Sequence, residues 1–349
     1  MNCIEIIEKI EKKIEVSKSE LVYLLENITD NEAEILRKKA QNTALESFGN
    51  KIYIRGLIEI SSICKNDCYY CGLRRSNKNA VRYRLTKEQI LDCCEQGYAL
   101  GFRTFVMQGG EDGYYTDEIM CDIIKTIKSL YPDCAITLSL GERGTESFKK
   151  LYEAGADRYL LRHETANAEH YNKLHPIEMS LETRKNSLYE LKKIGFQTGA
   201  GFMVGSPYQT YETLAEDLLF LKDLDPQMCG IGPFLPHKDT IFKDEQGGSV
   251  RLTLILLALV RIMLPNVLLP STTALGTADS NGREMGILHG ANVVMPNLSP
   301  KEHRKDYMLY DNKIATGDEA AESIRKLSER FKAIGYEIVT ERGDYKKGK

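Results

Sequence analysis

The amino-acid sequence predicts an α/β protein whose core is a complete (β/α)8 barrel of the TIM type. Apolar, strand-like segments alternate with helical patterns eight times between residues 52 and 295, and this alternation favours a parallel sheet covered by helices. The strand-like segments are almost continuously apolar, as expected where both faces of a sheet are buried. A length of 349 residues suits one barrel with extensions. A doubly wound open sheet is the alternative, but it would need an edge strand and a glycine-rich fingerprint after the first strand, and neither is seen.

We expect three parts along the chain. Residues 1–48 indicate two polar-faced helices that form an N-terminal helical extension. Residues 49–300 form the barrel, and residues 301–349 form a short C-terminal closing segment with one amphipathic helix at about 318–335. The expected barrel strands are 52–60, 104–108, 135–140, 158–161, 198–204, 228–232, 267–272 and 292–295. The expected barrel helices begin after a capping box at Thr86 and continue at 116–130, 145–154, 167–194 with a break at Pro176, 211–224, 250–264 and 281–289.

Composition excludes several classes of partner. The formal net charge is −3, which gives no electrostatic support to a nucleic-acid or anionic-membrane partner. The first residues lack the basic and apolar regions of a signal peptide. The longest apolar run, Leu252 to Leu264, contains Arg261 and is too short to span a bilayer. We therefore expect a cytoplasmic protein whose nine cysteines are thiols in a reducing compartment.

Three cysteines give the strongest indication of a metal or iron–sulfur site in the sequence. Cys64, Cys68 and Cys71 are separated by three and then two residues, directly after the first expected strand. Thiolates favour iron–sulfur clusters, zinc or copper(I). Structural zinc usually takes four ligands from paired knuckles, and here there is no second knuckle and no nearby histidine. Three thiolates on a 4Fe–4S cluster would leave one iron open to a substrate or cofactor, so we favour such a cluster and keep zinc as the alternative. The other cysteines are interpreted as ordinary core or surface residues: Cys3, Cys93, Cys94, Cys121, Cys134 and Cys229.

Polar residues gather where the expected strands end, which is where barrel enzymes place their chemistry. These ends contain Gln108 to Asp112, Thr137 with Ser139, Arg162 to Thr165, and Thr272 with Thr273. Such a mouth suits a small zwitterionic ligand together with a polar substrate. An isolated helix arginine such as Arg184 is usually a surface residue, although it could pair with a carboxylate as a bidentate fork. The two threonines could equally be ordinary strand residues.

The cysteine spacing, with Tyr70 before the last cysteine, resembles the signature of radical S-adenosylmethionine (SAM) enzymes, and Gly109-Gly110-Glu111 resembles their "GGE" motif. Longer segments resemble the HydE family, the radical SAM maturases of FeFe-hydrogenase, over roughly residues 50–312. They are 58–75, 77–79, 82–84, 108–112, 137–142, 154–167, 198–201, 230–234, 272–277, 282–284 and 290–292. The resemblance implies that Cys64, Cys68 and Cys71 ligate the cluster. It implies that SAM is bound by Tyr70, Gly109, Gly110, Glu111, Glu164 and Arg184. It also implies an inner substrate cavity lined by Arg55, Thr137, Arg162, Thr272, Thr273 and Tyr307.

The same resemblance implies a function. The enzyme would cleave SAM reductively and act on a cysteine-bound iron complex with carbonyl and cyanide ligands. Its partners would be the maturases HydG and HydF and a flavodoxin or ferredoxin as reductant. Family members often carry a second cysteine group near the C-terminus, but residues 314–326 contain none, so no auxiliary cluster is expected. The alternatives are a methylornithine synthase-like mutase, biotin synthase-like sulfur chemistry, and a non-catalytic zinc- or cluster-binding module.

Overall fold

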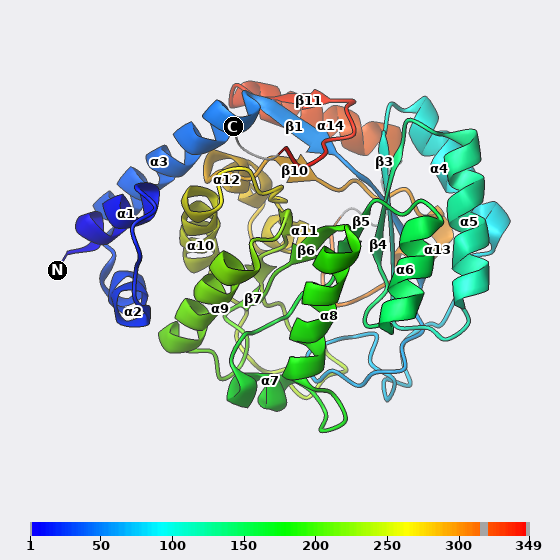
Figure 1. Ribbon diagram of the computed structural model, residues 1–349, viewed down its shortest axis with the longest axis horizontal. Coiled ribbons are helices and arrows are strands. Elements are labelled where there is room, and N and C mark those ends of the chain that lie inside the picture. The colour runs from blue at the N-terminus through cyan, green and yellow to red at the C-terminus, as the bar shows by residue number, and fades with distance from the viewer. Residues whose placement is uncertain (1, 315–319, 347–349) are drawn as a thin grey trace.

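Parallel strands form the centre of the computed structural model, which describes residues 2–314 and 320–346, and helices surround them (Figure 1). The largest sheet has the order β2-β3-β4-β5-β6-β8, and every neighbouring pair is parallel. Its strands are β2 (Gly56–Ser61), β3 (Thr104–Gly109), β4 (Ala135–Ser139), β5 (Arg158–Leu160), β6 (Gln197–Ala200) and β8 (Met228–Cys229). The prediction of an α/β fold built on parallel strands is therefore confirmed.

A second parallel sheet lies beside the first. It has the order β10-β1-β11, with β1 at Lys51–Ile54, β10 at Val293–Val294 and β11 at Glu337–Val339. The first expected strand, 52–60, is thus divided between β1 and β2, with Arg55 between them. Two further short strands, β7 (Met203–Val204) and β9 (Gly232–Pro233), pair with each other. They continue the lines of β6 and β8, which we expected as single strands.

Residues 267–272 do not form the regular strand that we expected. This segment makes only single parallel bridges, Leu268 to Met228 and Pro270 to Val293. Proline has no backbone N–H to donate to a ladder, which explains why the hydrogen bonding is interrupted at Pro270.

A helix follows each strand position, and together these helices enclose the sheets (Figure 1). Those at expected positions are α4 (Lys87–Ala99), α5 (Asp117–Leu130), α6 (Thr145–Glu153), α7 (Ala168–Leu174), α8 (Leu181–Ile194), α9 (Tyr211–Leu224), α10 (Val250–Met263) and α12 (Gly282–Leu288). Two short helices were not expected, α11 (Thr273–Ala278) and α13 (Lys301–Arg304). None of the helices among the described residues is both long and apolar enough to cross a membrane.

The N-terminal extension contains three helices, so the prediction of two was wrong. They are α1 (Cys3–Glu11), α2 (Lys18–Asn27) and α3 (Asp30–Phe48). Each begins with its own capping box, at Asn2, Ser17 and Thr29. A capping box satisfies backbone donors only at a helix start, so the boxes at Ser17 and Thr29 begin a second and a third helix where only one further helix was expected.

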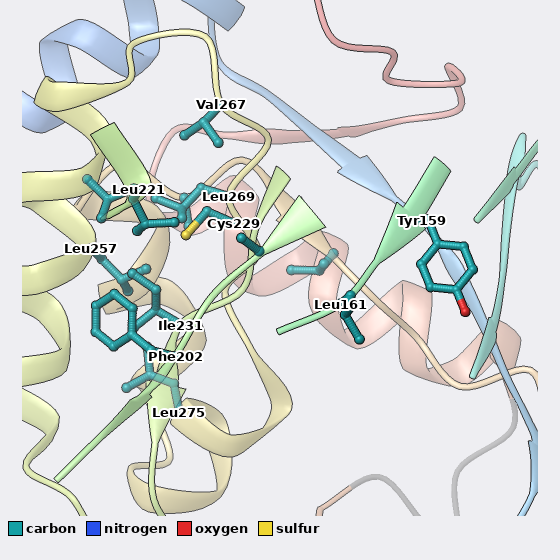
Figure 2. Close-up of a cluster of buried hydrophobic side chains, with 14 of the residues drawn as sticks. Tyr159, Leu161, Phe202, Leu221, Cys229, Ile231, Leu257, Val267, Leu269 and Leu275 are labelled. Atoms are coloured by element: carbon teal, nitrogen blue, oxygen red, sulfur yellow. The ribbon is translucent and has the colours of Figure 1, made fainter. Parts of the chain in front are cut away.

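The apolar core fills the space between the strands and the outer helices. α10 is buried along almost its whole length because α3 packs on its outer side. Figure 2 shows Leu221 of α9 and Leu257 of α10 close to Cys229 and Ile231 at the sheet. Cys229 is completely buried there, which agrees with its interpretation as a core residue.

The C-terminal segment closes the amino ends of the strands, which the sequence did not reveal. α14 (Ala320–Ala333) confirms the expected amphipathic helix, although the expected start at 318–319 lies outside the described residues. Asp344, which follows β11, places its Oδ1 2.6 Å from Nη2 of the fully buried Arg158 in β5. Nη1 of Arg158 donates to Thr104 Oγ1 at 3.0 Å. Arg342 pairs with Asp157 at 2.9 Å. The last strand and these ion pairs therefore fasten the end of the chain beneath the sheet.

Replacing Asp344 with asparagine should lower the free energy of unfolding by about 1–2 kcal/mol, because a buried guanidinium loses its anionic partner. Burial alone would raise the pKa of Asp344, but the hydrogen bond from Arg342 and the charge of Arg158 outweigh it and hold that pKa well below its usual range. The carboxylate therefore stabilises the fold at neutral pH, and this contribution is lost as the pH falls below about 4. Urea unfolding at pH 7 and at about pH 3, below the unfolded pKa of an aspartate, measures both effects. Glu341→Gln, which removes an exposed partner of Lys51, is the control and should change neither midpoint.

Candidate active site

The cysteine-containing loop is a compact structure that follows β2. Its main organiser is Arg82, which donates to four backbone carbonyls, those of Ser62, Leu73, Arg74 and Asn77, at 2.6–3.1 Å. In the same loop the Asp67 carboxylate accepts hydrogen bonds from Arg74, and these hold the pKa of Asp67 well below its usual range. The loop is thus fixed by its own polar side chains and needs no regular secondary structure.

The three cysteines lie half-buried on the inner side of this loop. Cys64 Sγ accepts a hydrogen bond from the backbone N–H of Glu111 at 3.4 Å. Cys68 Sγ lies 3.7 Å from the sulfur of Met179. The backbone N–H of Cys71 donates to the carbonyl of Cys68 at 3.2 Å. Burial raises the pKa of Cys71 to about 12, so its thiolate needs a metal or a cation to compensate the charge.

The spacing of the donors distinguishes between the two kinds of metal centre left open by the sequence. Within residues 2–314 and 320–346, no three His, Cys, Asp or Glu side chains converge on a position for one metal ion. A single zinc ion with bonds of about 2.3 Å would need its three sulfurs within roughly 4 Å of one another. A 4Fe–4S cluster takes each thiolate on a different iron atom. The arrangement therefore fits a cluster better than a mononuclear site.

The glycines after β3 bring the main chain against the cysteine loop. A Cβ atom on Gly110 would lie 2.3 Å from the carbonyl oxygen of Ile63 and 2.7 Å from Cβ of Cys64. Only glycine permits this approach. The carboxylate of Glu111 accepts from the backbone N–H of Glu142 at 3.0 Å and lies 3.1 Å from Nζ of Lys65, which belongs to the cysteine loop. The structure therefore brings Gly109 and Gly110 to the cysteines and directs the Glu111 side chain to a neighbouring hollow.

A cavity of about 290 Å³ opens beside Cys71, at the carboxyl ends of the strands. Seven of the predicted site residues line it: Tyr70, Cys71, Gly109, Arg162, Glu164, Arg184 and Tyr307. Gln108 and Ser139, which were expected at the polar strand ends, also line it. The remaining members of the lining were not predicted as site residues: Gly141, Leu160, Leu161, Met203, Pro233, Phe234, Leu235, Ala274, Leu309 and Tyr310. The cavity thus combines residues from most of the strand ends with one cysteine of the loop.

Arg162 and Glu164, which line this cavity, form an ion pair whose atoms are not fully hydrogen-bonded. Nη2 of Arg162 lies 2.9 Å from Oε2 of Glu164, but the two groups are not aligned as a hydrogen bond. Nε and Nη2 of Arg162 and Oε2 of Glu164 are buried without a hydrogen-bond partner. Glu164 also has a positive φ of 64°, which is costly for a residue with a side chain. Because buried polar atoms are normally satisfied, this arrangement suits a ligand that carries both charges.

Arg184 is held at the cavity wall by two neighbours. Its Nε donates to the carboxylate of Glu142, and its Nη1 donates to the backbone carbonyl of Arg162 at 2.8 Å. The sequence offered no way to pair Glu142 with Arg184, because Glu142 lies in the loop after β4 and Arg184 lies in α8. The surface interpretation of Arg184 is excluded, since its side chain is 8% exposed.

The predicted inner residues separate into two groups. Arg55 and Thr137 line a smaller cavity of about 20 Å³, and Leu160 lines both cavities. Nη1 of Arg55 lies 3.0 Å from the sulfur of Met228, while its Nε and Nη2 have no partner, and burial lowers the pKa of this guanidinium. Thr272 instead caps α11 through Leu275 N–H at 3.2 Å, and Thr273 lies 3.5 Å from Nη2 of Arg283. Neither threonine is among the residues lining the two cavities.

Tyr70 is oriented by a histidine that the sequence did not indicate. The phenol oxygen lies 3.3 Å from Nε2 of the buried His175, whose ring stacks on Tyr171 with centroids 3.9 Å apart. Nδ1 of His175 lies 3.0 Å from the carbonyl oxygen of Tyr171. A carbonyl can only accept, so Nδ1 carries the proton and Nε2 accepts from the Tyr70 hydroxyl. Burial lowers the pKa of His175 to about 3, so it remains neutral.

Residues 305–314, hereafter the closing strap, cross the mouth of the cavity. Tyr307, Leu309 and Tyr310 contribute to its lining. The strap is fastened by a buried ion pair between Lys313 and Glu59 and by the hydrogen bond from Gly72 N–H to the Leu309 carbonyl at 2.9 Å. Glu59, a charged residue inside the apolar run of β2, was a possible indication of this contact.

Another cavity, of about 310 Å³, lies between α1, α9 and the end of α10. Its lining is mainly apolar, including Ile10, Leu219 and Met263. It contains no cysteine of the loop and no convergent set of unpaired polar atoms, so the cavity beside Cys71 is the better candidate for chemistry.

Comparison with known proteins agrees with this choice. Residues 58–221 match the family described as the Radical SAM superfamily. The chain is 45% identical over 331 residues to the [FeFe] hydrogenase maturase subunit HydE of Thermotoga maritima, which covers 95% of this chain and 94% of that protein. The crystal structure of methylornithine synthase superposes with a TM-score of 0.82 at 26% identity over 95% of this chain and 97% of that one. HydG from Carboxydothermus hydrogenoformans shares the fold, with a TM-score of 0.79, 20% identity, and coverage of 96% of this chain and 79% of that chain.

Proposed function

From the premise that this chain belongs to the HydE family of radical SAM enzymes, the FeFe-hydrogenase maturases, we propose that it binds one 4Fe–4S cluster through Cys64, Cys68 and Cys71. The observation that carries the proposal is the cavity in which Cys71 lies beside the Arg162–Glu164 ion pair, whose buried atoms lack hydrogen-bond partners. When bound, the reduced cluster supplies the electron that cleaves SAM to methionine and a 5′-deoxyadenosyl radical. The lack of cysteine in 314–326 supports a single cluster.

The residues around the cavity have complementary roles in holding SAM. Its methionyl group is a zwitterion, and Arg184 and Glu164 offer it a cation and an anion on one wall. Gly109 and Gly110 allow the main chain to reach the amino group, with Glu111 holding the neighbouring backbone through Glu142. Tyr70 packs against the adenosyl group. A closed, largely apolar wall excludes water from the radical.

We propose an anionic substrate, the cysteine-bound iron complex with carbonyl and cyanide ligands. The buried Arg55 and the partly exposed Arg162 both have N–H groups without a hydrogen-bond partner. Arg55 also forms no ion pair with a described residue, so an anionic ligand would offset the cost of its buried charge. Thr137 and Tyr307 add hydroxyls near these cations. Thr272 and Thr273 would reach such a substrate only if α11 shifted, because their hydroxyls contact α11 and Arg283.

We further propose that the strands close into a complete (β/α)8 barrel over residues 49–300, between the 1–48 extension and the 301–349 closing segment. Single bridges and hydrogen bonds support closure. Cys229 N–H donates to Leu268, Ser271 N–H to Val293, and Leu57 N–H to Pro296, at 2.9–3.1 Å. These contacts link β8 through residues 268–271 and β10 back to β1 and β2.

The partners proposed for this chain follow from its family. HydG would supply the substrate, HydF would receive the product, and a flavodoxin or ferredoxin would reduce the cluster. No nucleic-acid or membrane partner is proposed. The nine cysteines are free thiols, in keeping with the reducing cytoplasm that we propose as its location.

Complementation tests the assignment directly. The chain should restore hydrogenase activity in a host that lacks HydE but retains HydF and HydG. Failure in that host, together with conversion of lysine to methylornithine by the purified protein, would assign it to the mutases that share its fold. Anaerobic protein containing one zinc and no iron would reject both enzymes.

Replacing His175 with phenylalanine should raise the dissociation constant for SAM roughly fivefold and leave kcat nearly unchanged, because one hydrogen bond of about 1 kcal/mol no longer fixes the Tyr70 ring. The substitution keeps the stacking on Tyr171. Tyr70→Phe should produce a similar rise. The double variant should be no weaker than either single one, since both remove the same contact. Additive losses measured by calorimetry with anaerobic protein would contradict this role.

A further inference from the structure

We infer that the loops around Ile177 form a docking surface for a flavodoxin, through which the electron enters. This inference rests on the proposed function and identifies the partner surface for that site. Ile177, between α7 and α8, is fully exposed, and it is the most exposed large apolar residue in the described part of the chain. Ile241, Tyr208 and Val81 are the next most exposed, at 57–61%. Exposed apolar groups gathered on one face mark interaction sites.

These four residues belong to loops that pack together. The loops that contain Val81, Tyr208 and Ile241 follow β2, β7 and β9, and the loop that contains Ile177 joins α7 to α8. A small apolar cluster of Leu174, Met203, Phe234 and Phe242, with Tyr69 and Tyr70 against it, joins the loops beneath the surface. The ring of Tyr208 lies 6.2 Å from that of Phe242, and Asn79 donates to Asp239 at 2.8 Å. Figure 1 shows α7 and the light-blue loop after β2 at the same end of the molecule.

The docking surface adjoins the cysteines. Met179, two residues after Ile177, lies 3.7 Å from Cys68 through its sulfur. Arg75 of the cysteine loop pairs with Glu178 at 3.5 Å. A donor seated on Ile177 is therefore separated from the proposed cluster by one short, partly buried loop.

Charge favours an acidic partner. Residues 62–85 contain six basic residues and one acidic residue, in a chain whose net charge is −3. Lys65, Arg75 and Arg84 have carboxylate partners in Glu111, Glu178 and Asp112. Lys78 is exposed and forms no ion pair with a described residue. Opposite charges steer association and fix orientation.

The docking surface calls for a partner that is acidic and that offers an apolar contact to Ile177. A flavodoxin has both properties, because it is an acidic protein whose flavin presents an apolar edge. That edge matches Ile177 better than the polar loop around a ferredoxin cluster does. In the step itself the flavin hydroquinone loses one electron and becomes the semiquinone, while the enzyme gains one electron. No bond to the protein forms or breaks.

The test compares two reductants on the reconstituted enzyme. Ile177→Asp and Lys78→Glu should each slow SAM cleavage driven by photoreduced flavodoxin by about fivefold or more, while cleavage driven by dithionite stays unchanged. Raised salt should slow the flavodoxin reaction of the wild type more than that of Lys78→Glu. Leu130→Asp, which changes a 55% exposed apolar residue at the end of α5, is the control and should change neither rate.

Three results would overturn the inference. They are unchanged flavodoxin-driven rates in both variants, equal losses with dithionite, and losses with ferredoxin but not with flavodoxin. A wild type that cleaves no SAM even with dithionite would reject the proposed function itself. A measured affinity between the reconstituted enzyme and flavodoxin, weakened by Ile177→Asp, would support docking even then.

Discussion

Replacing Cys68 with alanine should abolish both cluster binding and SAM cleavage. Two thiolates would remain for a cluster that takes three, and the open iron that we propose for SAM would no longer be defined. The loop itself should keep its conformation, because Arg82 and Asp67 fix it through contacts that do not involve the Cys68 side chain. The measurements are iron and sulfide content, the visible absorption of the reconstituted protein, and 5′-deoxyadenosine formed with dithionite.

Cys121→Ala provides the control for this experiment. Cys121 is a partly exposed thiol in α5, away from the loop, so its removal should leave iron content and SAM cleavage intact. Cleavage at the wild-type rate in Cys68→Ala would reject the three-cysteine site. A loss in Cys121→Ala would show that reconstitution is sensitive to any thiol.

Replacing Lys313 with methionine should destabilise the protein by about 3–5 kcal/mol, the usual cost of removing one partner of a buried ion pair. Glu59 is 1% exposed, and besides Lys313 its carboxylate accepts from Asn297 at 2.9 Å. Burial already raises the pKa of Glu59, and without Lys313 the carboxylate would be left uncompensated. Lys313 also donates to the Tyr307 carbonyl at 3.0 Å, so the closing strap should loosen and SAM cleavage should fall.

The double variant Glu59→Gln with Lys313→Met distinguishes charge from packing. It removes both charges together, so it should recover most of the stability lost in Lys313→Met. Lys149→Met, which breaks an exposed pair with Glu146, should leave the urea midpoint unchanged. Equal losses in the single and double variants would mean that the lysine acts through packing alone.

Much of the fold could be predicted because the capping residues and apolar periods that define each helix lie within that helix or next to it. The helix at 211–224 begins and ends as expected, since Thr210 caps it and its apolar face is periodic. The capping boxes at Ser17 and Thr29 were equally visible as Ser-x-x-Glu and Thr-x-x-Glu, and weighing them would have given three N-terminal helices. The strand β11 could not be inferred, because it has three residues and pairs with β1 almost 290 positions away.

The candidate site likewise contains some residues that the sequence could place and others that it could not. The cysteines and glycines are brought together by short connections on neighbouring strands, so spacing and strand order sufficed. Thr272 was expected in the cavity, but its hydroxyl caps α11. The apolar pattern did not reveal this short helix. His175 and Met179 reach Tyr70 and Cys68 only through the packing of a distant loop, and a sequence contains no local mark of such a contact.

The fastening of the C-terminal segment has a consequence for biosynthesis. While the ribosome is still producing residues 320–346, one side of β1 has no neighbour and the guanidinium of Arg158 has no counter-ion. The nascent chain can therefore assemble its helices early but can seal its sheet only near the end of translation. Until then the edge of β1 stays exposed unless another molecule in the cell shields it. Synthesis arrested shortly before residue 337 should therefore yield an aggregation-prone product.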